Sequence, residues 1–158
     1  MSTITLKGII DEDFVNYKVP SMSLMFPQCS FKCGEDNCQN RSLKDEPDVS
    51  IEIDDLCMRY INNPITEAIV CQGLEPIDSF KELLQFIKTL RYKYRCFDDF
   101  VIYTGYNEDE IQFETTTLRY FPPVVMKFGR YIAGDDAHFD DILGVNLISD
   151  NQYGVRLE

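Results

Sequence analysis

Short apolar runs alternate with segments of helical periodicity along the middle of this chain, and this alternation constrains the fold more than any other feature. Strands are predicted at 21–26, 67–72, 100–105 and 122–132. Helices are predicted between them, at 51–63, from Pro76 to about Tyr94, and after Asn107. Strands that alternate with helices are typical of a mostly parallel sheet with crossover helices. The sequence therefore predicts an α/β fold.

The segment boundaries rest on particular residues. Pro64 and Gly73 bound the apolar run 67–72, and Pro76 suits the first position of the helix that follows. Apolar residues of that helix recur at helical spacing, at Ile77, Phe80, Leu84 and Ile87. Residues 3–10 are predicted to form a first strand at an edge, and 144–149 and 153–158 to form short strands or a hairpin.

Composition restricts the classes of partner. The chain has 158 residues, of which 44% are hydrophobic and 27% charged, which favours one globular domain over residues 1–158. The net charge of −12 repels phosphate backbones and anionic lipids, so we expect no nucleic-acid partner. The sequence MSTITLKGIIDED at the N-terminus has neither the basic start nor the apolar core of a signal peptide. No apolar run is long enough to span a membrane, so a cytoplasmic protein without membrane contact is expected.

Three cysteines are crowded into the long polar segment 27–50, at Cys29, Cys33 and Cys38. Thiolates hold both zinc and iron–sulfur clusters, and in a cytoplasmic chain such cysteines are more often ligands than disulfide partners. A structural zinc site needs a fourth ligand, whereas the chain's only histidine, His138, lies a hundred residues away. The alternative is that the cysteines are simply buried, but their neighbours are polar. The pattern therefore favours a metal site with one open position.

The predicted sheet suggests where such a site would lie. Ligands of parallel sheets bind beyond the carboxyl ends of the strands. The cysteine segment follows the strand 21–26, the turn Gly73-Leu74-Glu75-Pro76 follows 67–72, and Thr104-Gly105-Tyr106 follows 100–105. We therefore expect these three stretches to share one edge of the sheet.

These stretches together resemble the radical S-adenosylmethionine superfamily, and most closely the small activating protein of anaerobic ribonucleotide reductase. The matching residues are Cys29-Ser30-Phe31-Lys32-Cys33 with Cys38, Gly73-Leu74-Glu75-Pro76, Ile102-Tyr103-Thr104-Gly105-Tyr106 and Ser149-Asp150-Asn151-Gln152. The order, spacing and overall length fit from about residue 20 to the end. The resemblance implies an incomplete (β/α) TIM-like barrel with a mostly parallel sheet.

It also implies a chemistry. Cys29, Cys33 and Cys38 would hold a [4Fe–4S] cluster, whose open iron would chelate the amino and carboxylate groups of S-adenosylmethionine. Reductive cleavage would give a 5′-deoxyadenosyl radical that takes a hydrogen from a glycine of anaerobic ribonucleotide reductase, with a low-potential electron donor such as flavodoxin. The resemblance assigns cofactor binding to Gly73, Leu74, Glu75, Pro76, Thr104 and Gly105.

The sequence departs from the superfamily pattern at three points. Four residues separate Cys33 from Cys38 where two are usual, Asn37 stands where an aromatic residue is common, and Leu74 replaces a second glycine. These departures leave two alternatives open. One is a relative of the same fold that acts on another substrate, and the other is a non-catalytic zinc or iron–sulfur interaction module.

Other residues have plain structural interpretations. Cys57, Cys71 and Cys96 stand alone in apolar patterns. Cys57 is predicted to pack in the core, Cys71 to be a small buried side chain or to face the site, and Cys96 to be structural or exposed. Carboxylates surround His138, but without calcium-loop spacing, so a solvated acidic loop is expected there. For Glu75, capping of the following helix and direct contact with a ligand remain equally open. Asn151 and Gln152 could form a turn before the last strand.

Overall fold

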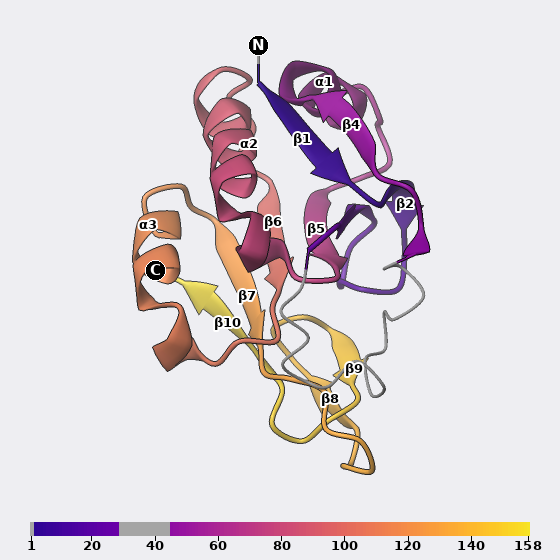
Figure 1. Ribbon diagram of the computed structural model, residues 1–158, viewed down its shortest axis with the longest axis vertical. Coiled ribbons are helices and arrows are strands. Elements are labelled where there is room, and N and C mark those ends of the chain that lie inside the picture. The colour runs from indigo at the N-terminus through magenta and orange to yellow at the C-terminus, as the bar shows by residue number, and fades with distance from the viewer. Residues whose placement is uncertain (1, 29–44) are drawn as a thin grey trace.

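A computed structural model describes residues 2–28 and 45–158, and its main layer is a six-stranded sheet in the order β10-β7-β6-β5-β3-β2 (Figure 1). The strands are β2 (Gly8–Asp13), β3 (Ser21–Phe26), β5 (Ala68–Gly73), β6 (Asp99–Tyr103), β7 (Val124–Phe128) and β10 (Tyr153–Leu157). The neighbours β3, β5, β6 and β7 pair in parallel, whereas β2 and β10 pair antiparallel at the two edges. The carboxyl ends of the parallel strands therefore lie together at one end of the sheet, and this end is here called the rim.

Helices connect the parallel strands and cover one face of the sheet (Figure 1). They are α1 (Ile53–Ile61), the 3-10 turn η3 (Pro76–Ser79) with α2 (Phe80–Tyr92), and the 3-10 turn η4 (Glu108–Glu110) with α3 (Gln112–Leu118). Leu56, Leu83 and Leu118 of these helices are fully buried in one cluster with Phe100 and Met126 of the sheet. Each such side chain contributes about 1.5–3 kcal/mol of hydrophobic stabilisation.

The opposite face of the sheet carries a second core. Ala68, Val70, Val101 and Val125 point to this face and pack with Tyr17, Leu143 and Leu147, which lie outside the sheet. Because both faces of the parallel strands are covered, the strands are apolar at nearly every position rather than at alternate ones. This explains the continuous apolar runs in the sequence.

Two small antiparallel sheets flank the main layer. In the first, β1 (Thr3–Leu6) pairs with β4 (Val49–Glu52), and the Thr5 N–H donates to the Glu82 carboxylate of α2 at 2.6 Å. In the second, β8 (His138–Asp140) pairs with β9 (Val145–Leu147). Figure 1 shows β1 and β4 beside the helices, and β8 and β9 at the rim end of the molecule.

The predicted strands at 21–26, 67–72 and 100–105 are confirmed to within two residues by β3, β5 and β6. The predicted strand 3–10 is two strands in different sheets, because the chain passes between them at Lys7, whose N–H donates to the Met25 carbonyl. The helix predicted at 51–63 is α1, which begins two residues later than predicted because Ile51 and Glu52 belong to β4 and pair with β1.

The end of the chain does not form one hairpin. Residues 145–147 pair with β8, whereas β10 pairs with β7. Within the described ranges β2 and β10 remain edges of an open sheet, so the incomplete barrel stays a prediction, as does the single domain over residues 1–158. No helix in residues 2–28 or 45–158 is long and apolar enough to cross a membrane.

Candidate cluster and cofactor site at the rim

The rim brings together the ends of four parallel strands. Beyond β3 the chain continues through Pro27 and Gln28 toward the cysteines, and beyond β5 it enters the turn at 73–76. The two are joined by backbone hydrogen bonds: Leu74 N–H donates to the Phe26 carbonyl at 3.1 Å, and Glu75 N–H to the Gln28 carbonyl at 2.6 Å. The segment that leads to Cys29 is therefore fixed against the predicted cofactor turn.

Gly73 is required by the close approach of these two strands. Its φ angle is +94°, in the region that favours glycine. A Cβ atom there would lie 2.6 Å from the Phe26 nitrogen and 2.7 Å from the Met25 Cα atom. Since both neighbours are backbone, no side-chain rotation can relieve the contact. Any larger residue must therefore separate the turn from β3.

The Glu75 carboxylate joins this turn to the next one. Glu75 is buried at 4% exposure, and its Oε1 atom accepts a hydrogen bond from Gly105 N–H at 2.8 Å. Its Oε2 atom accepts from Ile77 N–H and from the Thr104 hydroxyl, each at 3.0 Å. The predicted capping role is confirmed by the Ile77 contact. The predicted cofactor residues of the two turns thus meet through one carboxylate.

The environment of Glu75 makes this carboxylate titratable near neutrality. Burial raises the pKa of Glu75 to about 7, although the hydrogen bonds from Gly105, Ile77 and Thr104 act in the opposite direction. Burial dominates because a desolvated charge costs more than three hydrogen bonds recover. The rim therefore contains an acid whose charge changes within the physiological pH range.

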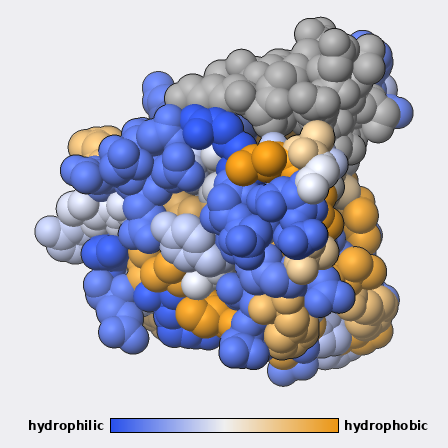
Figure 2. Space-filling view, turned by 90° about the horizontal axis from the view of Figure 1, so that it is seen from below, coloured by the Kyte–Doolittle hydropathy of each residue, from blue (hydrophilic) through white to orange (hydrophobic). Residues whose placement is uncertain are grey.

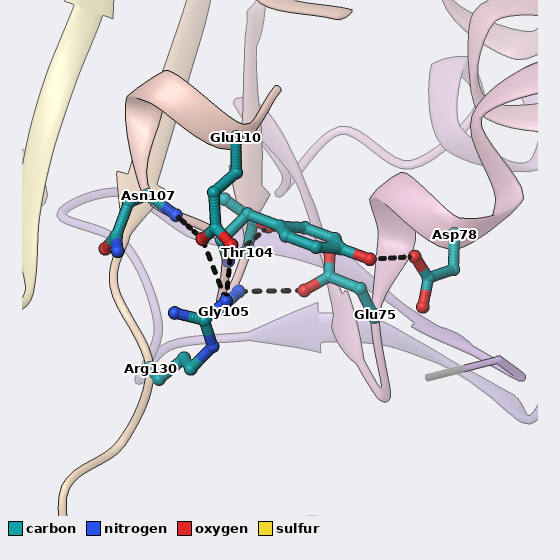
Figure 3. Close-up of polar contacts among 8 residues, drawn as sticks. Glu75, Asp78, Thr104, Gly105, Asn107, Glu110 and Arg130 are labelled. Atoms are coloured by element: carbon teal, nitrogen blue, oxygen red, sulfur yellow. Dashed lines mark hydrogen bonds and ion pairs between the residues drawn. The ribbon is translucent and has the colours of Figure 1, made fainter. Parts of the chain in front are cut away.

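Residues around Thr104 and Gly105 fix the second turn (Figure 3). The Tyr106 N–H donates to the Thr104 hydroxyl at 3.1 Å, and the Tyr106 hydroxyl donates to the Asp78 carboxylate of η3 at 2.6 Å. Tyr106 is therefore a second link between the ends of β5 and β6. A separate ion pair lies beside this turn: Arg130 Nη2 donates to both carboxylate oxygens of Glu110, at 2.8 and 2.7 Å.

Asn107 precedes η4, and its N–H donates to the Glu110 carboxylate at 2.9 Å. The helix predicted to start at Glu108 is in fact the 3-10 turn η4, and α3 begins only at Gln112. The turn keeps Glu110 within reach of Arg130, on the connection that follows β7.

Lys127 is a rim residue that the sequence prediction missed. It is the one charged residue of β7, it is 7% exposed, and its Nζ atom donates to the Gly129 carbonyl at 2.9 Å and the Thr104 carbonyl at 3.2 Å. The ammonium also lies 5.8 Å from the centre of the Tyr103 ring. A lysine inside an apolar strand, two residues before a glycine, was the signal that could have identified it.

The C-terminal turn completes the network. The predicted turn at Asn151 and Gln152 is confirmed by a hydrogen bond from Gln152 N–H to the Ser149 carbonyl. Gln152 Nε2 donates to the Gly129 carbonyl at 3.3 Å, and Asn151 Nδ2 donates to the Arg130 carbonyl at 2.9 Å. The ends of β5, β6 and β7 are thus linked in sequence by polar contacts.

The predicted cluster ligands Cys29, Cys33 and Cys38 lie outside the described residues. The described cysteines are poor ligand candidates: burial raises the pKa of Cys57 to about 12 and raises the pKa of Cys71 and Cys96 as well. Cys57 and Cys71 are fully buried, which confirms their structural interpretation. In residues 2–28 and 45–158 no group of three potential metal ligands is found.

Two of the acidic residues near His138, Asp135 and Asp140, have structural roles. The Asp140 carboxylate accepts hydrogen bonds from Leu143 N–H and Gly154 N–H, at 2.9 and 3.0 Å. Asp135 accepts from Asp150 N–H at 3.0 Å. These carboxylates therefore stabilise the connections around β8 and β9. Seen from the rim end, the surface mixes hydrophobic and hydrophilic residues (Figure 2).

The chemistry of the available donors fits a cluster held by three thiolates. Clusters of this kind use thiolates that are deprotonated and accessible, which excludes the buried Cys57 and Cys71. Of the four other thiols, Cys96 is partly buried and burial raises its pKa, whereas Cys29, Cys33 and Cys38 follow Gln28, whose carbonyl accepts the Glu75 N–H at the rim. Three ligands leave one coordination position of a four-iron cluster open.

Comparison with known proteins supports this assignment at the level of the cluster. Residues 20–134 match the family model of the 4Fe-4S single cluster domain, and the matched region includes all three clustered cysteines. No curated protein and no solved structure matches the chain. The family match covers well over half of the chain, which therefore belongs to the 4Fe-4S single cluster domain family.

Proposed function

We propose that this protein is a radical S-adenosylmethionine activating enzyme that generates a glycyl radical on anaerobic ribonucleotide reductase. Membership in a 4Fe-4S family supplies the redox group that this reaction needs. The observation that carries the proposal is the contact between the two predicted cofactor turns: Glu75 binds Thr104 and Gly105, while its own N–H holds the segment that leads to the cysteines.

In this proposal Cys29, Cys33 and Cys38 hold the cluster, and S-adenosylmethionine binds at its open position. When bound and reduced, the cluster supplies the electron for cleavage of the sulfonium compound, and a low-potential donor such as flavodoxin restores it. The protein binds the cofactor, orients it and excludes water. No general base is required, which agrees with the scarcity of histidine in the chain.

The contacts of Glu75 define its part in this site. Both carboxylate oxygens already accept protein donors, and the side chain is buried. We therefore assign Glu75 the role of a positioning residue that holds the Gly73–Pro76 turn, rather than a direct ligand of the amino group. The backbone of this turn is then the surface that meets the methionine end of the cofactor, because carbonyl oxygens suit an ammonium group.

The test is anaerobic incubation of the reconstituted protein with dithionite and S-adenosylmethionine, followed by quantification of 5′-deoxyadenosine. We expect 5′-deoxyadenosine from the unaltered protein and none from Cys38→Ala. Addition of anaerobic ribonucleotide reductase should then produce the electron paramagnetic resonance signal of a glycyl radical.

Each contrary result selects a rival. Formation of 5′-deoxyadenosine without a glycyl radical on the reductase would favour a relative that acts on another substrate. Stoichiometric zinc without sulfide would contradict the proposal and favour an interaction module. If the protein holds an intact cluster but forms no 5′-deoxyadenosine, the result would contradict the proposal and favour an iron–sulfur protein without this activity.

A further inference from the structure

The chain that carries the clustered cysteines is attached on both of its sides to described parts of the fold. Before Cys29, β3 lies in the main sheet between β2 and β5. After Cys38, the chain is described again from residue 45 and enters β4, which pairs with β1 beside the helices (Figure 1). β1 and β2 are consecutive, and the residue between them is Lys7. Lys7 therefore lies between the partners of the two sides.

Lys7 contacts the chain on both sides of the cysteines. Its backbone N–H donates to the Met25 carbonyl of β3 at 2.7 Å. Its Nζ atom donates to the Glu46 carbonyl at 2.5 Å and forms an ion pair with the Asp48 carboxylate at 2.9 Å. The backbone of Lys7 thus holds the side that precedes the cysteines, and its ammonium holds the side that follows them.

The Lys7 side chain is far less exposed than its partner. It is 10% exposed, whereas the Asp48 side chain is 55% exposed. By contrast, the lysine of the Lys93–Asp54 ion pair, which joins the residue after α2 to α1, is 60% exposed. Lysine is seldom buried unless it is paired, because its ammonium loses hydration. The Lys7 ammonium is therefore held by the packed part of the protein and contacts an exposed segment.

The small sheet of β1 and β4 has other contacts that hold it together. β1 pairs with β4 along its whole length, and Ile4 and Leu6 of β1 are fully buried. The contacts of the Lys7 ammonium lie outside this pairing, because Glu46 and Asp48 precede β4. The ammonium therefore restrains the segment that leads from the cysteines to β4 more than it restrains the sheet itself.

We propose that Lys7 is a positioning residue of the cluster, whose ammonium holds the chain that returns from the cysteines beside the carboxyl end of β3. A cluster held by three thiolates has no fourth protein ligand to compensate when one thiolate moves. Ligands that are fixed before binding lose less conformational entropy, so they hold their group more tightly. This inference rests on the ligand set Cys29, Cys33 and Cys38 and not on the reaction with S-adenosylmethionine.

A plain packing role for Lys7 is the alternative. A lysine stem can cover apolar side chains while its ammonium finds the nearest polar atoms. Lys7→Met separates the two roles, because methionine keeps an apolar stem and the backbone contact with Met25 but removes the ammonium. Lys7→Arg keeps a cation that can bind both a carbonyl and a carboxylate, so it should rescue the positioning role.

The test measures the release of iron from the anaerobically reconstituted protein to an excess of ferrous chelator, without denaturant. Lys7→Met should release iron about fivefold faster than the unaltered protein, as expected for the loss of one hydrogen bond and one ion pair. Lys7→Arg should release it at nearly the unaltered rate. Lys93→Met is the matched control, since it removes another lysine–aspartate pair, and it should leave the rate unchanged.

Urea titration of the same variants measures the stability of the fold separately. Equal iron release from Lys7→Met and the unaltered protein would overturn the proposal. Faster release from both Lys7→Met and Lys93→Met, in proportion to their loss of stability, would overturn it in favour of a purely structural role. Release from Lys7→Arg as fast as from Lys7→Met would also overturn it. The readout is iron rather than 5′-deoxyadenosine, so the inference stands or falls independently of the reaction proposed above.

Discussion

Two buried charged residues hold the two ends of the parallel strands, and they do so in different ways. At the rim the Glu75 carboxylate accepts three hydrogen bonds from residues of two turns. At the opposite end the Arg91 guanidinium donates to four carbonyls of two connections. Both side chains are nearly inaccessible, at 4% and 1% exposure. At each end of the sheet, one nearly inaccessible charged side chain therefore links two segments of the chain.

The difference lies in how the two charges respond to pH. Burial lowers the pKa of Arg91, but a guanidinium starts so high that it stays charged at every physiological pH. Burial raises the pKa of Glu75 to about 7, so its charge is lost or gained near neutrality. The charge that holds the amino end is thus constant, whereas the charge of Glu75 at the rim changes when the carboxylate gains or loses one proton. We expect function to reside at the rim.

The largest expected difference between the ends concerns the cluster. Cys29→Ala, Cys33→Ala and Cys38→Ala should each abolish it, because three ligands leave none in reserve. Cys57→Ala, on the buried face of α1, should retain it. Iron and sulfide analysis after anaerobic reconstitution measures this, and retention of iron and sulfide by Cys38→Ala would show that the ligand set is wrong.

Gly73→Ala should distort the rim most strongly. The new Cβ atom would lie 2.6 Å from a backbone nitrogen, at a φ angle of +94°. Strain and overpacking together should cost about 4 kcal/mol in the free energy of unfolding, measured by urea titration. Gly8→Ala is the matched control, since nothing lies within 4 Å of its new Cβ atom. Equal stability of the two variants would refute the required close approach.

Arg91→Met should destabilise the protein without changing the cluster content or the reaction at the rim. It leaves four carbonyls without their donor, which should cost about 4 kcal/mol. Below the unfolding transition the variant should retain its full iron and sulfide content and its 5′-deoxyadenosine yield. Loss of the cluster from the folded variant would show that the two ends are coupled.

Glu75→Gln should remove a pH dependence that Arg91→Met keeps. The folded protein holds the Glu75 proton more tightly than the unfolded chain, with a pKa of about 7 instead of 4.5. The free energy of unfolding should therefore fall as pH rises through this window, by about 3 kcal/mol in total, and stay level above it. Denaturation at pH 5 and pH 8 measures this slope, and an identical slope in Glu75→Gln would refute the assignment.

The order of strands and helices was largely predictable because each segment carries its own apolar pattern. The run at 67–72 and the helix after Pro76 lie where their patterns indicate, since burial on both faces of a parallel strand and on one face of a helix leaves distinct signatures. The two parts of 3–10 were not separated, because pairing with β4 and with β3 is decided by distant residues.

The residues of the candidate site could be named from the sequence, but the contacts between them could not be predicted. Gly73, Glu75, Thr104 and Gly105 could be named from the sequence, whereas the carboxylate that joins them depends on the register of β5 against β6. Lys127 was missed because a lysine in an apolar strand can also be an edge residue. Arg91 lies within the helix predicted from Pro76 to about Tyr94, but its burial follows only from the carbonyls that surround it in the fold.

The most direct test of the central claim is the electron paramagnetic resonance spectrum of the reduced protein with and without S-adenosylmethionine, together with iron and sulfide analysis. We predict four irons and four sulfides per chain, as a [4Fe–4S] cluster requires, and a spectrum that changes on addition of S-adenosylmethionine. A full cluster whose spectrum is indifferent to S-adenosylmethionine would contradict an open coordination position at the rim.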